Sequence, residues 1–151
     1  MTYSVNFANY TIGEDAYQNV REVCRHYGKK ALLIGGELAL KAGKEKLIQA
    51  LASEIQIVDT VLFGTDCTYA RMEELAEHAK KCGADMIFGM GGGKALDTAK
   101  GTAEKAGLPV FTFPTIAATC AATTALSVVY KEDGNFDSFY FYDKLVPHSV
   151  S

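Results

Sequence analysis

Short apolar runs alternate along the chain with longer amphipathic segments. The apolar or β-branched runs predict strands at residues 30–34, 55–63, 85–90 and 108–113. Apolar positions at helical spacing predict helices over residues 17–26, 37–54, 69–81 and 91–106. Strands that alternate with helices are typical of a parallel sheet with helices on both faces. The pattern therefore predicts an α/β fold, a Rossmann-like doubly wound parallel sheet.

The C-terminal part of the chain has a different pattern. A turn signal at residues 132–135 precedes a segment, residues 136–142, that is dense in aromatic and β-favouring residues. We expect a C-terminal β-hairpin over about residues 127–142, with residues 121–130 forming a short helix that runs into a strand. Residues 147–151 resemble the start of another strand, so residues 1–151 are expected to be one domain of a longer protein.

Composition and charge narrow the classes of function. The chain has 151 residues and a formal net charge of −3 without a basic patch, so nucleic acid is not an expected partner. Its apolar runs are too short to span a bilayer and no secretory signal opens it, so we expect no membrane partner and a cytoplasmic location. The cysteines and histidines have no metal-ligand spacing, so we expect reduced thiols and no metal site.

The segment Gly-Met-Gly-Gly-Gly-Lys-Ala-Leu-Asp-Thr-Ala-Lys at residues 89–100 points to anion binding. It lies where a predicted strand gives way to a predicted helix, and glycine there lets a ligand approach the backbone closely. Free N–H groups and the helix dipole favour an anion such as a pyrophosphate. Lys94 adds a positive charge beside this site, and Asp97 either compensates the helix dipole or orients the glycine loop or a cofactor group.

The glycine turn matches neither of two better-known phosphate motifs. A P-loop would need glycine at Phe88 and serine or threonine at Ala95, and the dinucleotide fingerprint would need glycine at Lys94. A tight turn without a ligand is therefore the alternative. The hydroxyl-rich segment at residues 113–120 follows the next predicted strand, where it either lines a ligand crevice or caps the following helix.

Three motifs in the second half of the chain carry a family resemblance. They are Gly-Gly-Gly-Lys-x-Leu-Asp-Thr-Ala-Lys at residues 91–100, Pro-Thr-Ile-Ala-x-Thr at 114–119 and Ala-Leu-Ser-Val-x-Tyr at 125–130. Together they closely resemble the glycerol dehydrogenase branch of the iron-containing alcohol dehydrogenase family. The resemblance implies a dehydroquinate-synthase-like fold, of which this chain is the N-terminal NAD(P)-binding half. It also implies hydride transfer between a small alcohol or polyol and a nicotinamide dinucleotide.

The resemblance implies which residues hold the cofactor. The expected set is Gly36, Gly92, Gly93, Lys94, Asp97, Thr115, Ala118, Thr124, Leu126 and Tyr130. Catalysis in the family uses a divalent metal, often zinc or iron, held by an aspartate and two histidines of a helical second domain that this sequence lacks. We therefore expect no catalytic or metal-binding residue here, His148 included, and weak cofactor binding without turnover by this chain alone.

Two positions depart from the family pattern. Cys120 stands where the family commonly has an aspartate that contacts the polyol. A thiol cannot replace that carboxylate as an acceptor, so the substrate could be a different alcohol or the activity could be lost. Alternatively, Cys120 is only a small buried residue. Gly36 stands where many members have an aspartate that binds the adenosine ribose and repels the 2′-phosphate of NADP. Glu37 could bind the ribose instead, or Lys41 a 2′-phosphate, so NAD is favoured and NADP stays open.

Two further expectations concern partners. A non-catalytic nucleotide-binding or interaction module is the alternative to an enzyme domain, and it would use the aromatic strand at residues 136–142 as an exposed edge. Members of the family often form homo-oligomers, so self-association is a further expectation.

Overall fold

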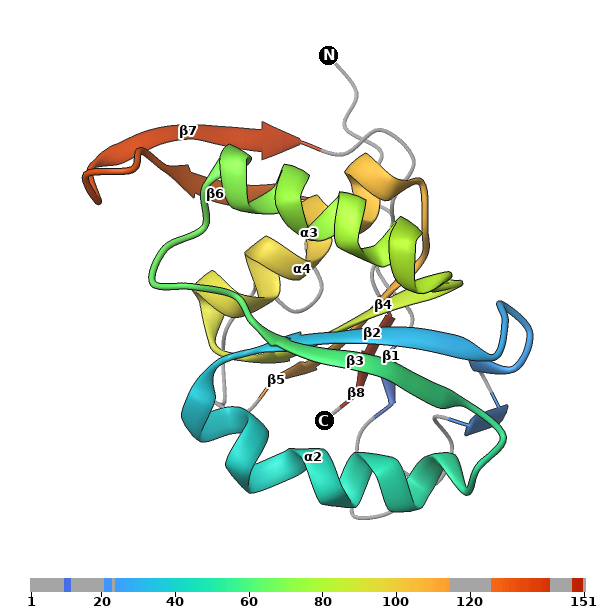
Figure 1. The fold of residues 1–151 in the computed structure, drawn as a ribbon. Coiled ribbons are helices and arrows are strands. Elements are labelled where there is room, and N and C mark those ends of the chain that lie inside the picture. The colour runs from blue at the N-terminus through green and yellow to red at the C-terminus, as the bar shows by residue number, and fades with distance from the viewer. Residues whose placement is uncertain (1–9, 12–20, 23, 115–125, 142–147, 151) are drawn as a thin grey trace.

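A six-stranded sheet forms the centre of the protein (Figure 1). The computed structural model describes residues 10–11, 21–22, 24–114, 126–141 and 148–150. The strands are β1 (Tyr10–Thr11), β2 (Lys30–Gly35), β3 (Gln56–Leu62), β4 (Met86–Gly91), β5 (Val110–Pro114) and β8 (His148–Val150). Their order is β1-β8-β5-β4-β2-β3, and every neighbouring pair runs parallel. The predicted parallel α/β sheet is confirmed.

Helices cover both faces of the sheet (Figure 1). They are α2 (Glu37–Leu51), α3 (Tyr69–Cys82) and α4 (Gly93–Ala106). On one face, Leu51 of α2 lies in a buried cluster with Leu33 of β2. On the other face, Ala99 of α4 lies in a second cluster with Leu32. Because successive residues of a strand point to opposite faces, the apolar run in β2 supplies both cores, and the doubly wound arrangement is confirmed.

Helix α4 is enclosed along most of its length. All residues from 95 to 103 are buried between the sheet, α3 and the C-terminal hairpin. A Cβ atom on Gly89 of β4 would lie 2.5 Å from the Cβ atom of Ala99, so glycine is needed for this close helix–strand approach. A Cβ atom on Gly101 would likewise lie 2.3 Å from the sulfur of Met72, which sets the approach of α4 to α3.

The predicted C-terminal β-hairpin is also confirmed. Strands β6 (Leu126–Tyr130) and β7 (Phe136–Phe141) pair antiparallel as a separate sheet. The hairpin packs on α3, because Val129 is buried in a cluster with Met72 and the Tyr69 hydroxyl lies 2.8 Å from the Ser138 hydroxyl. Residues 121–125, expected to form a short helix, lie outside the described residues.

Some predicted element bounds were wrong. Helix α2 ends at Leu51 instead of residue 54, because Ala52 and Ser53 adopt left-handed φ angles of 49° and 65°. Helix α4 begins at Gly93 instead of residue 91, because Gly91 still belongs to β4 and has a φ of 144° that no other residue type adopts easily. For the helix expected over residues 17–26, the described residues 21–22 and 24 are helical.

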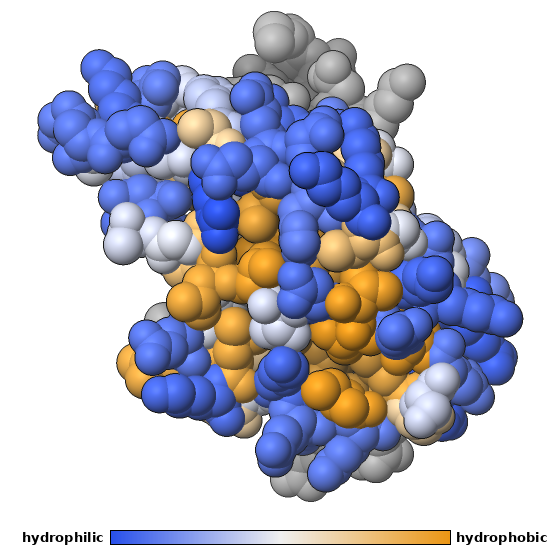
Figure 2. All heavy atoms as spheres, in the orientation of Figure 1, coloured by the Kyte–Doolittle hydropathy of each residue, from blue (hydrophilic) through white to orange (hydrophobic). Residues whose placement is uncertain are grey.

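The surface differs between the helices and the edge of the sheet. Hydrophilic side chains dominate over α3, whereas apolar side chains gather over β2 and the edge strand β3 (Figure 2). Leu62 of β3 is 51% exposed. None of the helices in the described part of the chain is both long enough and apolar enough to cross a lipid bilayer.

Candidate functional site

Two glycine turns meet at the carboxyl ends of β2 and β4. Gly36 precedes α2 and Gly92 precedes α4, and each is the N-cap residue of its helix. The two turns are in contact, because the Gly36 N–H donates to the carbonyl oxygen of Met90 at 3.2 Å. Two helix N-termini therefore open at one edge of the sheet, as parallel pairing of β2 with β4 requires.

A groove of about 440 Å³ lies along these turns. Its lining comes from both turns and from the end of β3: Gly36, Glu37, Leu38, Ala39, Phe63, Gly91, Gly92, Gly93, Lys94 and Ala95. Neither Gly36 nor Gly92 gives its helix a side-chain cap. Because the first N–H groups of a helix have no partner within that helix, the groove presents hydrogen-bond donors and the positive ends of two dipoles.

The fold does not require glycine at position 93. It begins α4, and a Cβ atom built on it meets no atom within 4 Å. The space in front of the turn is therefore open to a ligand that comes close to the backbone. On Gly36, a Cβ atom would lie 3.7 Å from the Phe63 ring, an ordinary van der Waals distance, so a side chain would fit there as well.

Lys94 connects the glycine turn to two other segments. Its ammonium lies 2.6 Å from Oδ1 of Asp66 and 4.9 Å from the centre of the Tyr130 ring. The hydrogen bond to Asp66 raises the pKa of Lys94, so the ammonium stays charged. The Tyr130 N–H in turn donates to the Cys67 carbonyl oxygen at 2.7 Å. Lys94 thus joins α4 to the β3–α3 loop and to the hairpin, with its side chain 49% exposed beside the groove.

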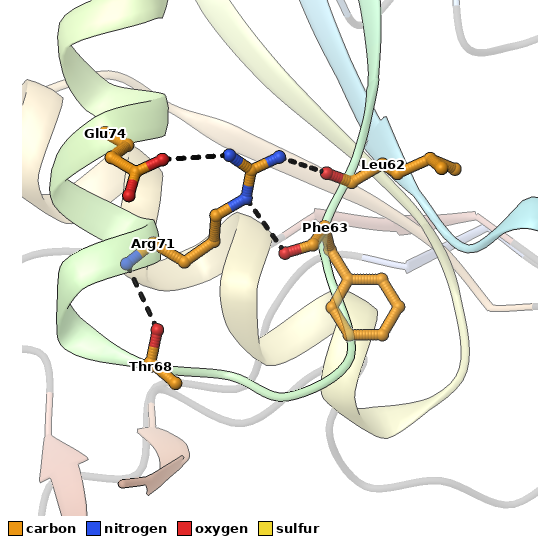
Figure 3. A network of polar contacts seen from close by, with 5 residues as sticks. All are labelled: Leu62, Phe63, Thr68, Arg71 and Glu74. Atoms are coloured by element: carbon orange, nitrogen blue, oxygen red, sulfur yellow. Dashed lines mark hydrogen bonds and ion pairs between the residues drawn. The ribbon is translucent and has the colours of Figure 1, made fainter. Parts of the chain in front are cut away.

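Arg71 holds the end of β3 and the residue after it, Phe63, which lines the groove (Figure 3). Its Nε donates to the carbonyl oxygen of Phe63 at 3.1 Å, and its Nη2 donates to that of Leu62 at 2.6 Å. Its Nη1 lies 3.1 Å from a carboxylate oxygen of Glu74, which fixes the guanidinium. Sequence reasoning did not single out Arg71, because its acceptors are backbone atoms of a segment that precedes the helix.

Asp97 points into the protein, where it pairs with another buried charge. Its Oδ1 lies 3.0 Å from Nζ of Lys100, and these side chains are 8% and 0% exposed. Asp97 is not among the residues that line the groove. Burial raises the pKa of the neighbouring Cys67 thiol to about 12, so this thiol is protonated and unreactive at neutral pH. The burial of Lys100 could not be predicted from the sequence, since a lysine on an amphipathic helix is normally exposed.

The structure brings together one part of the residue set expected from the resemblance. Gly36, Gly92, Gly93 and Lys94 line one groove, and Tyr130 lies under the Lys94 ammonium. Leu126 is the first residue of β6. Three further members of the expected set, Thr115, Ala118 and Thr124, lie outside the described residues. Cys120, the position expected to contact the substrate, lies outside them as well.

The groove does not provide the ligands of a catalytic metal. Among its described lining residues, Glu37 is the one carboxylate, and there is no histidine or cysteine. This donor set does not fit the zinc or iron site that the resemblance implies. The described cysteines Cys24, Cys67 and Cys82 are free thiols.

These features define a class of protein: a doubly wound α/β domain with uncapped helix N-termini at the carboxyl edge, as in dinucleotide-binding domains. Residues 8–150 match the model of the family described as iron-containing alcohol dehydrogenase. The chain belongs to the iron-containing alcohol dehydrogenase family, which confirms the resemblance seen in its motifs.

The chain is similar to a reductase and to glycerol dehydrogenases. The chain is 32% identical over 137 residues to the glycolaldehyde reductase of Halobacterium salinarum, covering 91% of this chain and 38% of that protein. It is 35% identical over 130 residues to the glycerol dehydrogenase of Pseudomonas putida, covering 86% of this chain and 36% of that protein. The crystal structure of glycerol dehydrogenase from Schizosaccharomyces pombe superposes with a TM-score of 0.80 at 26% identity, covering 99% of this chain and 39% of that one. The chain therefore spans less than two fifths of the length of these relatives.

Proposed function

We propose that residues 1–151 form the nicotinamide-dinucleotide-binding domain of a metal-dependent alcohol or polyol dehydrogenase. The observation that carries this proposal is the groove at the two uncapped helix N-termini, on Gly36 and Gly92. The relatives named glycerol dehydrogenase and glycolaldehyde reductase support a small hydroxylated substrate and hydride transfer to or from the nicotinamide.

The pyrophosphate would bind at the start of α4. Within the helix, the first backbone hydrogen bond at this end is donated by Leu96 to the Gly92 carbonyl oxygen at 3.0 Å. The N–H groups of Gly93, Lys94 and Ala95 precede that bond, so they are the donors that a phosphate oxygen would accept from. The Lys94 ammonium, held beside the groove by Asp66, would add a positive charge at about the same place.

The adenosine ribose would lie at the end of β2, next to Gly36. Glu37 lines the groove there, and its carboxylate is 3.6 Å from the Lys41 ammonium with both side chains largely exposed. A carboxylate at this position accepts hydrogen bonds from ribose hydroxyls and repels a 2′-phosphate. This favours NAD over NADP as the cofactor.

The remaining parts of the reaction lie outside this domain. A divalent metal, which polarises the substrate alcohol when bound, would be held by the part of the longer protein that this chain does not cover. The domain itself would position the cofactor and would have no catalytic residue. The free thiols of the described cysteines support a reducing compartment, the cytoplasm.

Thermal unfolding of the 151-residue chain with excess NAD, and separately with excess NADP, tests the proposal. A ligand at 100 times its dissociation constant stabilises the folded state by about 2.7 kcal/mol. For a domain of this size, that corresponds to a rise in Tm of roughly 5–10 °C. We expect the larger rise with NAD. No rise with either cofactor would favour the interaction module, in which the glycine turn is structural.

A variant of Gly93 tests whether the cofactor binds in the groove. Gly93→Asp adds a negative charge where a Cβ atom meets nothing, and an acidic residue stabilises the start of a helix, so the variant should fold and lose the rise in Tm. Gly93→Asn adds a side chain of the same volume without the charge, and this variant should keep part of the rise in Tm. Ala70→Asp adds the same charge at the start of α3, away from the groove, and this variant should keep the full rise in Tm. An unchanged rise in Gly93→Asp would mean that NAD binds elsewhere.

A further inference from the structure

Three different metal-ligating side chains converge between β3 and α3. They are Asp59, His78 and Cys82, and one donor atom from each lies within 4.8 Å of the other two. His78 and Cys82 stand one turn apart on α3, and Asp59 lies on β3, the edge strand of the sheet. None of the three lines the groove at the glycine turns. This group, the β3–α3 cluster, is therefore separate from the proposed cofactor site.

One distance in the cluster already matches a tetrahedral metal site. Cys82 Sγ lies 3.5 Å from His78 Nε2. Bond lengths of about 2.0 Å from zinc to nitrogen and about 2.3 Å from zinc to sulfur put these ligand atoms about 3.5 Å apart in a tetrahedral site. The same His78 Nε2 lies 2.6 Å from Asp59 Oδ2. A zinc ion between them would need about 3.3 Å, so the pair would open by about 0.7 Å.

The three side chains are partly exposed, so a metal can reach them from solvent. The side chains of His78 and Asp59 are 38% and 44% exposed, and Cys82 is half-buried. The Thr60 N–H donates to Asp59 Oδ1 at 2.8 Å, which leaves Oδ2 turned toward the histidine. Such a contact behind a ligand orients it for a metal.

We propose that Asp59, His78 and Cys82 bind one zinc ion through Oδ2, Nε2 and Sγ, with a water molecule as the fourth ligand. On binding, the Cys82 thiol releases its proton to solvent and the thiolate forms the Zn–S bond. The neutral His78 imidazole binds as the tautomer with its proton on Nδ1, so that the Nε2 lone pair faces the ion, and no oxidation state changes. The nitrogen and sulfur donors select zinc over magnesium or calcium, which prefer oxygen ligands. The bound ion joins the edge strand β3 to α3. This inference does not depend on the proposed cofactor site.

Cobalt(II), which takes the same ligands as zinc, reports on the cluster by its colour. We expect the reduced 151-residue chain to bind one equivalent, to develop thiolate-to-cobalt charge-transfer absorption and to lose it when zinc is added. Cys82→Ser should abolish that absorption and weaken zinc binding at least tenfold. His78→Gln and Asp59→Asn should each weaken zinc binding at least tenfold. All three side chains are partly exposed, so these variants should keep the far-UV circular dichroism of the parent.

Two control variants separate this site from adventitious binding. His26→Gln removes an exposed histidine elsewhere, and Glu77→Gln removes an exposed carboxylate on α3, so neither should change zinc affinity. Zinc should raise the Tm of the parent and of both controls but not that of Cys82→Ser. The proposal is overturned if no thiolate absorption develops, or if zinc binds Cys82→Ser as tightly as it binds the parent.

Discussion

Helices α3 and α4 start at the same edge of the protein but differ in how their N-termini are capped. Both N-cap residues are extended, with φ and ψ of −120° and 154° at Thr68 and −89° and −168° at Gly92. The Thr68 hydroxyl accepts a hydrogen bond from the Arg71 N–H at 3.1 Å, whereas Gly92 has no side chain to do so. A side chain of the protein therefore caps α3, whereas no side chain of the N-cap residue caps α4.

The two helices also differ in how they are stabilised. Along α3, the buried positions form one face and charged residues such as Glu73 and Lys80 cover the other. In α4, residues 95–103 are all buried, including the Asp97–Lys100 ion pair. Most helix stability in proteins comes from tertiary packing. A well-packed α4 can therefore do without a cap, which is what an anion-binding helix needs.

The buried ion pair should give the largest effect. Lys100→Met removes the ammonium and leaves the Asp97 carboxylate buried, which should lower the free energy of unfolding by about 4 kcal/mol. Lys105→Met is the matched control on the same helix, because the Lys105 ammonium is 3.8 Å from an exposed Glu73 carboxylate; it should cost at most about 1 kcal/mol. Urea unfolding measures both. Equal losses would show that burial does not distinguish the two lysines.

The close approach of α4 to β4 should give the next largest effect. In Gly89→Ala, the new Cβ atom would meet that of Ala99 at 2.5 Å, and neither can move without the backbone. Overpacking of this kind should lower the free energy of unfolding by about 2 kcal/mol. Gly93→Ala is the control in the same helix–turn unit, since its Cβ atom meets nothing within 4 Å, and it should be neutral or stabilising. A neutral Gly89→Ala in thermal unfolding would contradict the tight packing of α4.

Exchanging the caps gives the smallest effects and tests the comparison most directly. Thr68→Ala removes the α3 cap and should cost about 1 kcal/mol, whereas Thr68→Ser should cost much less. Gly92→Ser provides α4 with a cap at a backbone conformation that serine adopts, and should add a few tenths of a kcal/mol. It should also weaken NAD binding, because the serine oxygen then accepts from one of the free N–H groups. Stabilisation without weaker binding in NAD titrations would argue that the α4 N-terminus is not the anion site.

Much of the fold could be predicted because its signals are local. The apolar run in β2 and the helical spacing of Leu47 and Leu51 each report burial within a few residues of chain. The end of α2 could not be predicted, since Ala52 adopts a left-handed φ without the glycine that usually marks such a position. The start of α4 was predicted wrongly for a related reason, because the sequence does not show which of the three glycines at residues 91–93 ends the strand.

The candidate site likewise has parts that could be predicted from the sequence and parts that could not. The glycine turn, its position after a strand and the lysine behind it are contiguous, so the sequence alone could predict an anion site on Gly92 and Gly93. The partners of that lysine were not predictable, because Asp66 is 28 residues away from Lys94 and is brought to it by the loop before α3. The burial of Lys100 likewise depends on what surrounds α4.

The chain's pattern of apolar and glycine residues by itself determined the class of fold and the family. Repeating strand and helix units leave few ways to bury their apolar faces, and the motifs are read along the chain without its fold. Only the tertiary structure decided which polar side chains meet. His78 and Cys82 are four residues apart, a spacing that sequence reasoning passed over, and Asp59 joins them from 19 residues before His78 across the β3–α3 packing. A metal site needs donor atoms within a few ångströms, and that closeness is set by packing between elements.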